Sequence, residues 1–197
     1  SYYTTDLSSK GIWALSYITA LKKELQINSH IDQRMNNRLS TSAAVKQLKF
    51  LMEKYKSENW TLLAFITSPG YVSNIFKESK SKKWDEAQEF IDIKYLQNIK
   101  LINWLNQLDL KAFNSNYKTT NKNYQKYSFK EDLLFDAIAQ FKTIDFNQIN
   151  IKNSFLTGQM IPKNQSIVLK KELGNFILQN QSKIVAFQDS MTNNLFL

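Results

Sequence analysis

Residues 60–76 read WTLLAFITSPGYVSNIF, and this stretch decides how the first half of the chain is organised. Its first seven positions are almost all apolar, which predicts a helix that begins near Trp60. Pro69 lacks an amide hydrogen, and Gly70 has access to backbone angles that other residues avoid. The sequence therefore predicts that the helix stops at the Ser-Pro-Gly sequence, that the chain turns there, and that a second helix continues through Phe76.

Apolar residues at helical spacing predict further helices on both sides of this stretch. The segments are GIWALSYITALKKELQI (11–27), STSAAVKQLKFLMEKY (40–55) and FIDIKYLQNIKLINWLNQL (90–108). Ser40 or Thr41 is expected to cap the second of these helices. The segment NSHIDQRMNNRL (28–39) is polar and is predicted to be mostly loop, and ESKSKKWDEAQ (78–88) is charged and is predicted to be a solvated connection.

The pattern changes in the second half of the chain. A polar segment poor in aliphatic residues, near 113–124, is the best candidate for a linker. After it, YQKYSF (124–129) and QSIVLKK (165–171) are predicted strands, and KEDLLFDAIAQF (130–141) and DFNQINIKNSF (145–155) are predicted helices, the second capped by Asp145. We therefore predict a helical domain over 1–112, a linker over 113–124, and a small α+β segment with a C-terminal tail over 125–197.

Composition limits the classes of function. The chain has 197 residues, 43% of them apolar, and a formal net charge of +9, which favours attraction to a polyanion such as nucleic acid, an anionic membrane or peptidoglycan. Arginine-based reading of nucleic acid is disfavoured because Arg34 and Arg38 lie outside any dense basic stripe. The absence of cysteine excludes disulfides and thiolate chemistry, and a single histidine, His30, disfavours a Ser-His-Asp triad or a multi-histidine metal site.

The start of the sequence is abrupt. It opens at Ser1 without an initiator methionine, and it shows neither a signal peptide nor an apolar run near the ~20 residues of a membrane span. We expect the sequence to be a processed or partial segment of a longer polypeptide, whose membrane attachment through a preceding segment is left open.

Several sequence blocks occur in a fixed order along the first half. They are Ser1-x-Tyr3, GIW (11–13), IDQR (31–34), STSAAVKQL (40–48), and Trp60 followed by an apolar helix and SPGYV (68–72). This order resembles the lytic transglycosylase domain, the goose-lysozyme-like family, and most closely the membrane-bound lytic murein transglycosylase D type. The resemblance covers roughly residues 1–108 and implies a mainly α fold with a lysozyme-like helical domain.

The segment after the linker resembles the region located after the catalytic domain in such proteins. Its strand-helix-helix-strand order also resembles a degenerate LysM module, a βααβ unit that binds glycans containing N-acetylglucosamine. The Gly-Asp-Thr turn typical of that module is replaced here by Lys130-Glu131-Asp132. A purely structural role for this segment is therefore at least as well supported as glycan binding.

The resemblance implies a reaction and a set of residues. Family enzymes cleave the β-1,4 bond between N-acetylmuramic acid and N-acetylglucosamine with one Glu, which acts first as general acid and then as base toward the 6-hydroxyl, and they release 1,6-anhydro products. The matching Glu would directly precede Ser1, so no catalytic residue lies within this chain, and no cofactor or metal is implied. The substrate-binding residues that the resemblance implies are Tyr3, Trp13, Phe65, Ser68, Pro69 and Gly70.

The chain departs from the family pattern at polar positions. Phe65 stands where the family has Tyr, Ile66 where it has Asn, Ala14 where it has Gln, and Ser68 where it has the first Gly of Gly-Pro-Gly. Each loss of a polar side chain removes a contact that could stabilise the transition state. The matching positions are mainly scaffold, including an expected contact between Asp32 and Arg34. The other acids near these blocks, Asp6, Glu24, Glu53 and Glu58, are interpreted as caps or solvent-facing residues.

These expectations describe a peptidoglycan-associated protein of the periplasm and cell envelope, with outer-membrane association left open and with weak or no catalysis. Its partners would be peptidoglycan glycan strands and other envelope proteins, and not nucleic acid. Two alternatives stay open: an active lytic transglycosylase whose Glu lies just upstream of Ser1, and a protein-interaction scaffold in an envelope complex.

Overall fold

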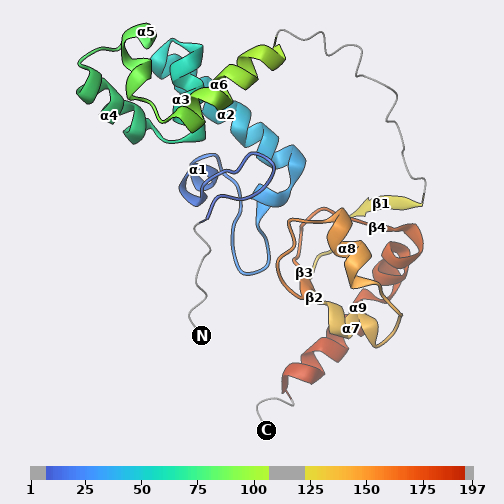
Figure 1. Cartoon of the computed structure of the whole chain (residues 1–197). Coiled ribbons are helices and arrows are strands. Elements are labelled where there is room, and N and C mark those ends of the chain that lie inside the picture. Colours follow the sequence, from blue (N-terminus) through green and yellow to red (C-terminus); the bar gives the residue numbers. More distant parts are fainter. Residues whose placement is uncertain (1–7, 107–122, 194–197) are drawn as a thin grey trace. The chain divides into compact units, whose positions relative to one another are not determined.

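The computed structural model describes residues 8–106 and 123–193, which form a mainly α protein (Figure 1). Contacts divide the chain into two compact units. The first unit joins residues 1–43 to residues 119–197, and the second unit comprises residues 44–118. Each unit has its own apolar core. The mainly α class predicted from the sequence is confirmed.

The second unit is a cluster of helices. Its elements are the later part of α2 (Asn37–Tyr55), α3 (Glu58–Ile66), α4 (Pro69–Ser79), α5 (Trp84–Ala87), η2 (Gln88–Phe90) and α6 (Ile93–Asn106). All four of the longer helices contribute to its core, whose buried residues are Leu51, Trp60, Leu63, Ala64, Val72, Ile75, Ala87, Ile91 and Ile99. The two helices predicted around the Ser-Pro-Gly turn are confirmed, as is the helix predicted within 90–108 as far as Asn106.

The charged segment 78–88 is more ordered than a solvated connection, so that prediction is wrong in part. It contains the short helix α5, and the Trp84 ring meets the Trp60 ring edge-on at 4.8 Å between centroids. The Trp60 indole N–H donates to the carbonyl of Lys82 at 2.9 Å. The half-buried Trp84 and the fully buried Ala87 anchor this segment to the core of the second unit.

The first unit starts with a much shorter helix than predicted. Over 11–27 only α1 (Tyr17–Lys22) is helical, and the Ser16 side chain caps it. Before it, Gly11 and Ala14 have positive φ values of 76° and 45°, and Lys10 pairs with Leu15 in an antiparallel bridge. The left-handed backbone at Gly11 and Ala14 forms a tight turn that is incompatible with an α-helix. The chain therefore becomes helical only at Tyr17.

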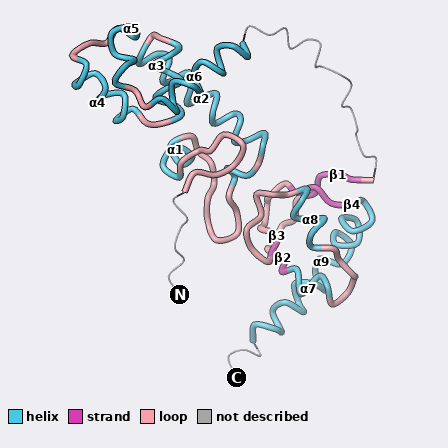
Figure 2. The backbone as a smooth tube through the Cα atoms, viewed as in Figure 1, coloured by secondary structure: helices cyan, strands magenta, loops and turns pink. Residues whose placement is uncertain are grey.

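A long loop separates α1 from α2, as Figure 2 shows in pink, and it contains the 3₁₀ turn η1 (Gln33–Met35). The predicted cap of α2 is wrong. The helix begins at Asn37, and the Asn36 side chain accepts from the backbone N–H of Leu39 at 3.1 Å. The hydroxyls of Ser40 and Thr41 instead donate to the Asn37 carbonyl inside the helix. Asparagine caps helices as well as serine does, so Asn36 caps α2 before the chain reaches Ser40.

The rest of the first unit follows the predicted strand-helix-helix-strand order with additions. Its elements are β1 (Tyr124–Tyr127), β2 (Leu133–Leu134), α7 (Phe135–Ala139), α8 (Phe146–Lys152), β3 (Met160–Ile161), β4 (Ile167–Lys170) and α9 (Lys171–Asn193). β1 pairs antiparallel with β4, and β2 pairs antiparallel with β3. The predicted helix over 130–141 is wrong at its start because Leu133 and Leu134 pair with β3. The Asp145 cap of α8 is confirmed, since its carboxylate accepts from the Gln148 N–H at 3.1 Å.

The 23-residue helix α9 was not predicted from the sequence. Ile177 and Ile184 on one side of it are fully buried in the core of the first unit. The helix packs against α7, β1, β2 and β4. Near its end, the Gln188 side chain accepts from the Leu134 N–H at 2.8 Å and donates to the Asp132 carbonyl at 3.2 Å. Helix α9 is therefore part of the folded first unit.

Residues of the N-terminal loop belong to the same core as the C-terminal segment. The Asp32 N–H donates to the Phe155 carbonyl at 2.7 Å, the Thr157 N–H donates to the His30 carbonyl at 3.0 Å, and Ile31 is buried in the core cluster. The contacts thus divide the described chain differently from the predicted boundaries. Most of the predicted linker lies outside the described residues, and the division into 1–112, 113–124 and 125–197 stays a prediction.

One buried hydroxyl in the second unit gives a stability prediction. Among the described residues, the Tyr55 hydroxyl is a buried side-chain oxygen with no hydrogen-bond partner. Because an unsatisfied buried polar group costs free energy, Tyr55→Phe should raise the free energy of unfolding by about 1 kcal/mol in urea denaturation. The matched control is Tyr71→Phe, which should lower it by about 1 kcal/mol. The Tyr71 hydroxyl accepts from the Asp92 N–H at 3.1 Å. A loss of stability in Tyr55→Phe would contradict the account.

Candidate functional site

The turn between α3 and α4 is built from local hydrogen bonds. The Thr67 hydroxyl donates to the Leu63 carbonyl at 2.5 Å, which closes α3. The Ser68 hydroxyl accepts from the Tyr71 N–H at 3.1 Å and caps α4, whose first residue is Pro69. Proline is well suited to that position because its missing N–H would have no partner there. The predicted interruption is confirmed, and the side-chain hydroxyls at the turn are engaged in the fold.

Gly70 does not use the conformational freedom that the sequence suggested. It lies in the first turn of α4 without a positive φ, and a Cβ atom there would meet only the Ser68 hydroxyl oxygen, at an ordinary 3.6 Å. The expectation that Gly70 supplies unusual backbone angles is wrong, because Pro69 and the Ser68 cap suffice to turn the chain. Gly70 is exposed, so no side chain projects from the turn at this position.

Phe65 and Ile66 are half-buried and pack against the core of the second unit. Their side chains therefore serve the apolar core in part and present hydrocarbon at the rest of their surface. The stretch 60–76 contains no acidic residue. The turn can offer apolar and aromatic contacts to a ligand, and its own side chains provide no proton donor of the carboxylic acid type.

A pair of tyrosines beside the turn was missed by sequence reasoning. The rings of Tyr71 and Tyr95 meet edge-on with centroids 5.4 Å apart, and the Lys94 ammonium lies 4.7 Å from the centroid of the Tyr95 ring. The Asp92 carboxylate accepts hydrogen bonds from the backbone N–H of Lys94 and from the Lys94 side chain. These two bonds, the backbone one first, hold the pKa of Asp92 below its usual value. The only sequence signal was the position of Tyr71 directly after Ser-Pro-Gly.

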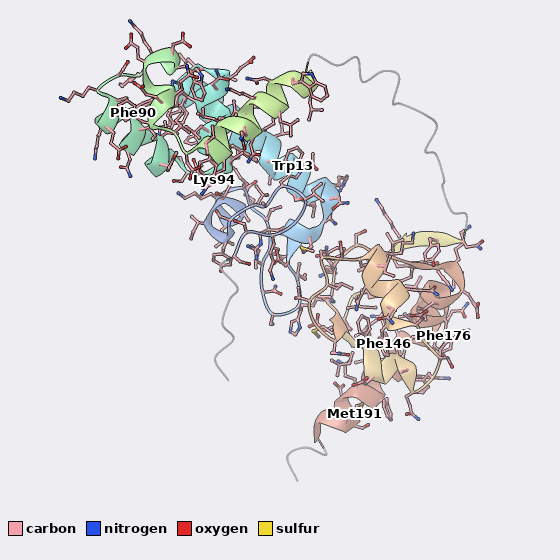
Figure 3. All side chains as sticks on the ribbon, viewed as in Figure 1. Trp13, Phe90, Lys94, Phe146, Phe176 and Met191 are labelled. Carbon is pink, nitrogen blue, oxygen red and sulfur yellow. The ribbon has the colours of Figure 1, made fainter. Side chains whose placement is uncertain are left out.

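Trp13 belongs to the first unit, whereas Phe65, Ser68, Pro69 and Gly70 belong to the second. Trp13, which Figure 3 labels, is 37% exposed, and its indole N–H donates to the Thr41 hydroxyl at 2.8 Å. This bond holds the nitrogen-bearing edge of the Trp13 indole against α2. Tyr3 lies outside the described residues. The substrate-binding assignment of this set stays a prediction.

The predicted contact between Asp32 and Arg34 is confirmed and is a fully formed ion pair. Arg34 donates from Nε to Oδ1 at 2.9 Å and from Nη2 to Oδ2 at 2.7 Å, and both side chains are almost completely buried. Arg34 also reaches the carbonyl of Ser8 at 2.5 Å, and the Lys10 ammonium lies 3.9 Å from Asp32. Burial by itself would raise the pKa of Asp32. The hydrogen bonds from Arg34 and the charges of Arg34 and Lys10 outweigh it and lower the pKa.

This ion pair should make stability depend on pH in the acid range. The folded-state pKa of Asp32 is lower than the ordinary value of 3.8, so the unfolded chain takes up a proton first as the pH falls. The stabilisation is complete above pH ~5 and is lost as the pH falls through the folded-state pKa. We expect the stability difference between the wild type and Asp32→Asn, measured by urea denaturation, to shrink between about pH 5 and about pH 3. A stability difference that stays constant over this pH range would rule out the lowered pKa of Asp32.

The other acids considered from the sequence do not form a site in the described chain. Glu24, Glu53 and Glu58 are exposed at or near helix ends and faces, as predicted, and Asp6 lies outside the described residues. Within residues 8–106 and 123–193, no group of three or more His, Asp or Glu side chains is arranged to hold a metal ion. In the same residues, no helix is both long enough and apolar enough to cross a bilayer.

No protein family model and no curated protein matches this chain. The resemblance carried by the sequence blocks therefore stays a prediction.

Proposed function

We propose that this chain is a lytic transglycosylase-like protein of the bacterial cell envelope that binds peptidoglycan glycan strands without cleaving them. The observation that carries the proposal is the α3–α4 turn. Its hydroxyls at Thr67 and Ser68 are engaged in ending one helix and capping the next, and the half-buried Phe65 and Ile66 add hydrocarbon to its surface. Aromatic and apolar surface suits packing against the faces of sugar rings, whereas cleavage needs a positioned acid.

The sequence blocks support a lysozyme-like helical arrangement through their positions on elements. STSAAVKQL lies within α2, Trp60 near the start of α3, and SPGYV at the start of α4. In the C-terminal segment, β1, α7, α8 and β4 occur in the order expected of a LysM-like module. These points support the finer fold assignment, which remains part of the proposal.

Product analysis tests the absence of cleavage. Purified peptidoglycan sacculi are incubated with the chain, and the soluble fraction is analysed by liquid chromatography and mass spectrometry, with an active lytic transglycosylase as positive control. We expect no 1,6-anhydro-muropeptides above the level without protein. Release in proportion to the amount of chain would overturn the proposal in favour of an active enzyme. The same assay on a polypeptide that includes the residue before Ser1 tests the alternative in which Glu lies upstream.

A second candidate, a scaffold for other envelope proteins, is favoured by the surface of α6. Leu101, Trp104 and Leu105 are 53%, 55% and 40% exposed there, and neighbouring exposed apolar residues of this kind are often contact sites. Trp104→Ser would abolish co-purification of a partner from envelope extracts if this candidate were correct. If the chain is only a scaffold, the wild type should not be retained on sacculi.

A further inference from the structure

A pocket in the C-terminal part of the first unit lies away from the α3–α4 turn in sequence and belongs to neither of the sites discussed above. It has a volume of about 290 Å³. Its walls are the ends of β1 and β4, the connection between α7 and α8, the start of α8, and the first turn of α9. This volume is at the lower end of the range for small-molecule sites, so the pocket fits a small ligand or one or two residues of a peptide.

The floor of the pocket is apolar and its rim is charged. Ile149 and Leu169 are buried below it, and Tyr124 stands at one side. Tyr124 and Lys170 are directly opposite each other in the β1–β4 pair, so their side chains project from the same face of the sheet. The Lys152 ammonium lies 5.2 Å from the centroid of the Tyr124 ring. Lys170 therefore lines the pocket beside Tyr124, and Lys152 adds a second positive charge close to the same ring.

Lys142 supplies a third cation, and it is held in place. Its ammonium pairs with the Glu172 carboxylate and lies 5.6 Å from the centroid of the Phe176 ring, which Figure 3 labels on α9. The Glu172 side chain is 80% exposed, whereas that of Lys142 is 32% exposed. Because the acid is largely in solvent and the base is anchored, a carboxylate from a ligand can replace Glu172 at Lys142 with little rearrangement.

Asp145 adds one negative charge to the lining of the pocket, at the start of α8. Its carboxylate caps the helix by accepting from the Gln148 N–H, and it lines the pocket. It would repel a ligand that is anionic throughout. A ligand with a carboxylate toward Lys142 and Lys170 and an ammonium toward Asp145 would match the charges of both signs that line the pocket.

We infer that this pocket binds a short peptide that carries both carboxylate and ammonium groups. The inference rests on the proposed function for the source of the peptide: the peptides attached to peptidoglycan glycan strands are acidic and contain a diamino acid. The pocket then adds recognition of the attached peptide to contact with the glycan itself.

The test is titration of the full chain with the tripeptide N-acetyl-L-alanyl-γ-D-glutamyl-meso-diaminopimelic acid, whose acetyl group stands in for the attachment to the glycan, followed by calorimetry or by NMR shifts. Lys142→Gln should weaken binding about threefold to tenfold, as expected for loss of one partly exposed charge pair. Glu172→Gln should tighten it, because the competing carboxylate is gone. Lys183→Gln, an exposed lysine on α9 away from the pocket, is the matched control and should leave the affinity unchanged.

Asp145→Asn tests the second charge without removing the helix cap, because asparagine caps helices as well as aspartate does. It should weaken binding of the tripeptide and leave unchanged the weaker binding of the version also acetylated on the diaminopimelate amine. Circular dichroism of each variant checks that the fold is kept. The inference is overturned if the tripeptide does not bind, if Lys142→Gln and Glu172→Gln shift affinity in the same direction, or if Asp145→Asn weakens both peptides equally.

A parallel experiment separates this inference from the proposed function. Sacculi are compared before and after an amidase has removed their peptides. Equal retention of the chain on both, without tripeptide binding, overturns the inference and leaves glycan binding standing. Retention on untreated sacculi that is lost after amidase treatment, with tripeptide binding intact, overturns glycan binding and leaves the pocket assignment standing.

Discussion

Arg34→Met should lower the free energy of unfolding by about 3–5 kcal/mol. The substitution leaves the Asp32 carboxylate buried without the two hydrogen bonds that Arg34 donates to its side chain, and only Lys10, at 3.9 Å, remains as a positive charge nearby. An uncompensated buried charge is far more costly than the loss of an exposed ion pair. Guanidinium denaturation followed by circular dichroism, together with hydrogen exchange of amides in the 28–36 loop, measures the effect.

Two variants control this prediction. Arg38→Met, on the exposed face of α2, should change stability by less than about 0.5 kcal/mol. Adding Asp32→Asn to Arg34→Met should recover part of the loss, because the orphaned charge is removed, with a coupling free energy of about 0.5–3 kcal/mol. Strict additivity of the two substitutions would show that the pair does not interact as the structure describes.

Gly174→Ala should lower the free energy of unfolding by about 1–3 kcal/mol even though alanine favours helix more than glycine does. A Cβ atom at Gly174 would lie 2.2 Å from two ring atoms of Tyr127. The ring has little room to move. Its hydroxyl is within hydrogen-bond distance of the Lys171 carbonyl and the Asn175 side chain, and its face stacks with Phe129 at 6.3 Å. The test is the stability of the variant, with hydrogen exchange in β1 and β4 as a local readout.

Gly70→Ala is the matched control, because it places the same methyl group in a helix where the nearest atom is 3.6 Å away. It should leave stability unchanged or raise it slightly. If Gly174→Ala were as well tolerated as Gly70→Ala, the close packing of α9 on β1 would be wrong.

Local signals in the sequence account for the elements that were predicted correctly. The Ser-Pro-Gly turn and the Asp145 cap depend on residues within three positions of one another, so a linear pattern is sufficient to find them. The β1–β4 pair was predicted as two separate strands, because each has alternating or β-branched residues. Their partnership, and the second pair formed by β2 and β3, depend on residues far apart in the chain and could not be predicted from local patterns.

The errors come from tertiary contacts that override local preference. The helix predicted over 11–27 does not form at its start, because Gly11 has a positive φ and packs closely against the Arg34 carbonyl of the following loop. A Cβ atom at Gly11 would lie 1.9 Å from that carbonyl oxygen. α9 was missed because its glycine and polar residues weaken the helical pattern, yet Gly174 is the residue that lets the helix approach the Tyr127 ring. Both cases show a glycine that is required by a neighbour distant in sequence.

The candidate site was predicted only in part, for a related reason. The Asp32–Arg34 contact could be predicted because the two residues are neighbours in the chain. Tyr71 and Tyr95 are 24 positions apart, and the pocket bounded by Lys142 and Glu172 joins segments 30 positions apart, so neither leaves a pattern in a single window. The assignment of Trp13 and of Phe65 to glycan binding stays a prediction, which the binding experiments test.

The most direct test of the account is the fraction of the chain that sediments with purified sacculi. The assay is run at low salt and at about 0.5 M salt, where adsorption of a basic protein to an anionic polymer is screened. We predict that the wild type sediments under both conditions. Phe65→Ala and Trp13→Ala should sediment less, and Phe90→Ala, which removes an exposed ring outside the turn, should match the wild type. A wild type that stays in the supernatant at high salt, or that is unaffected by the loss of Phe65 and Trp13, would contradict glycan binding.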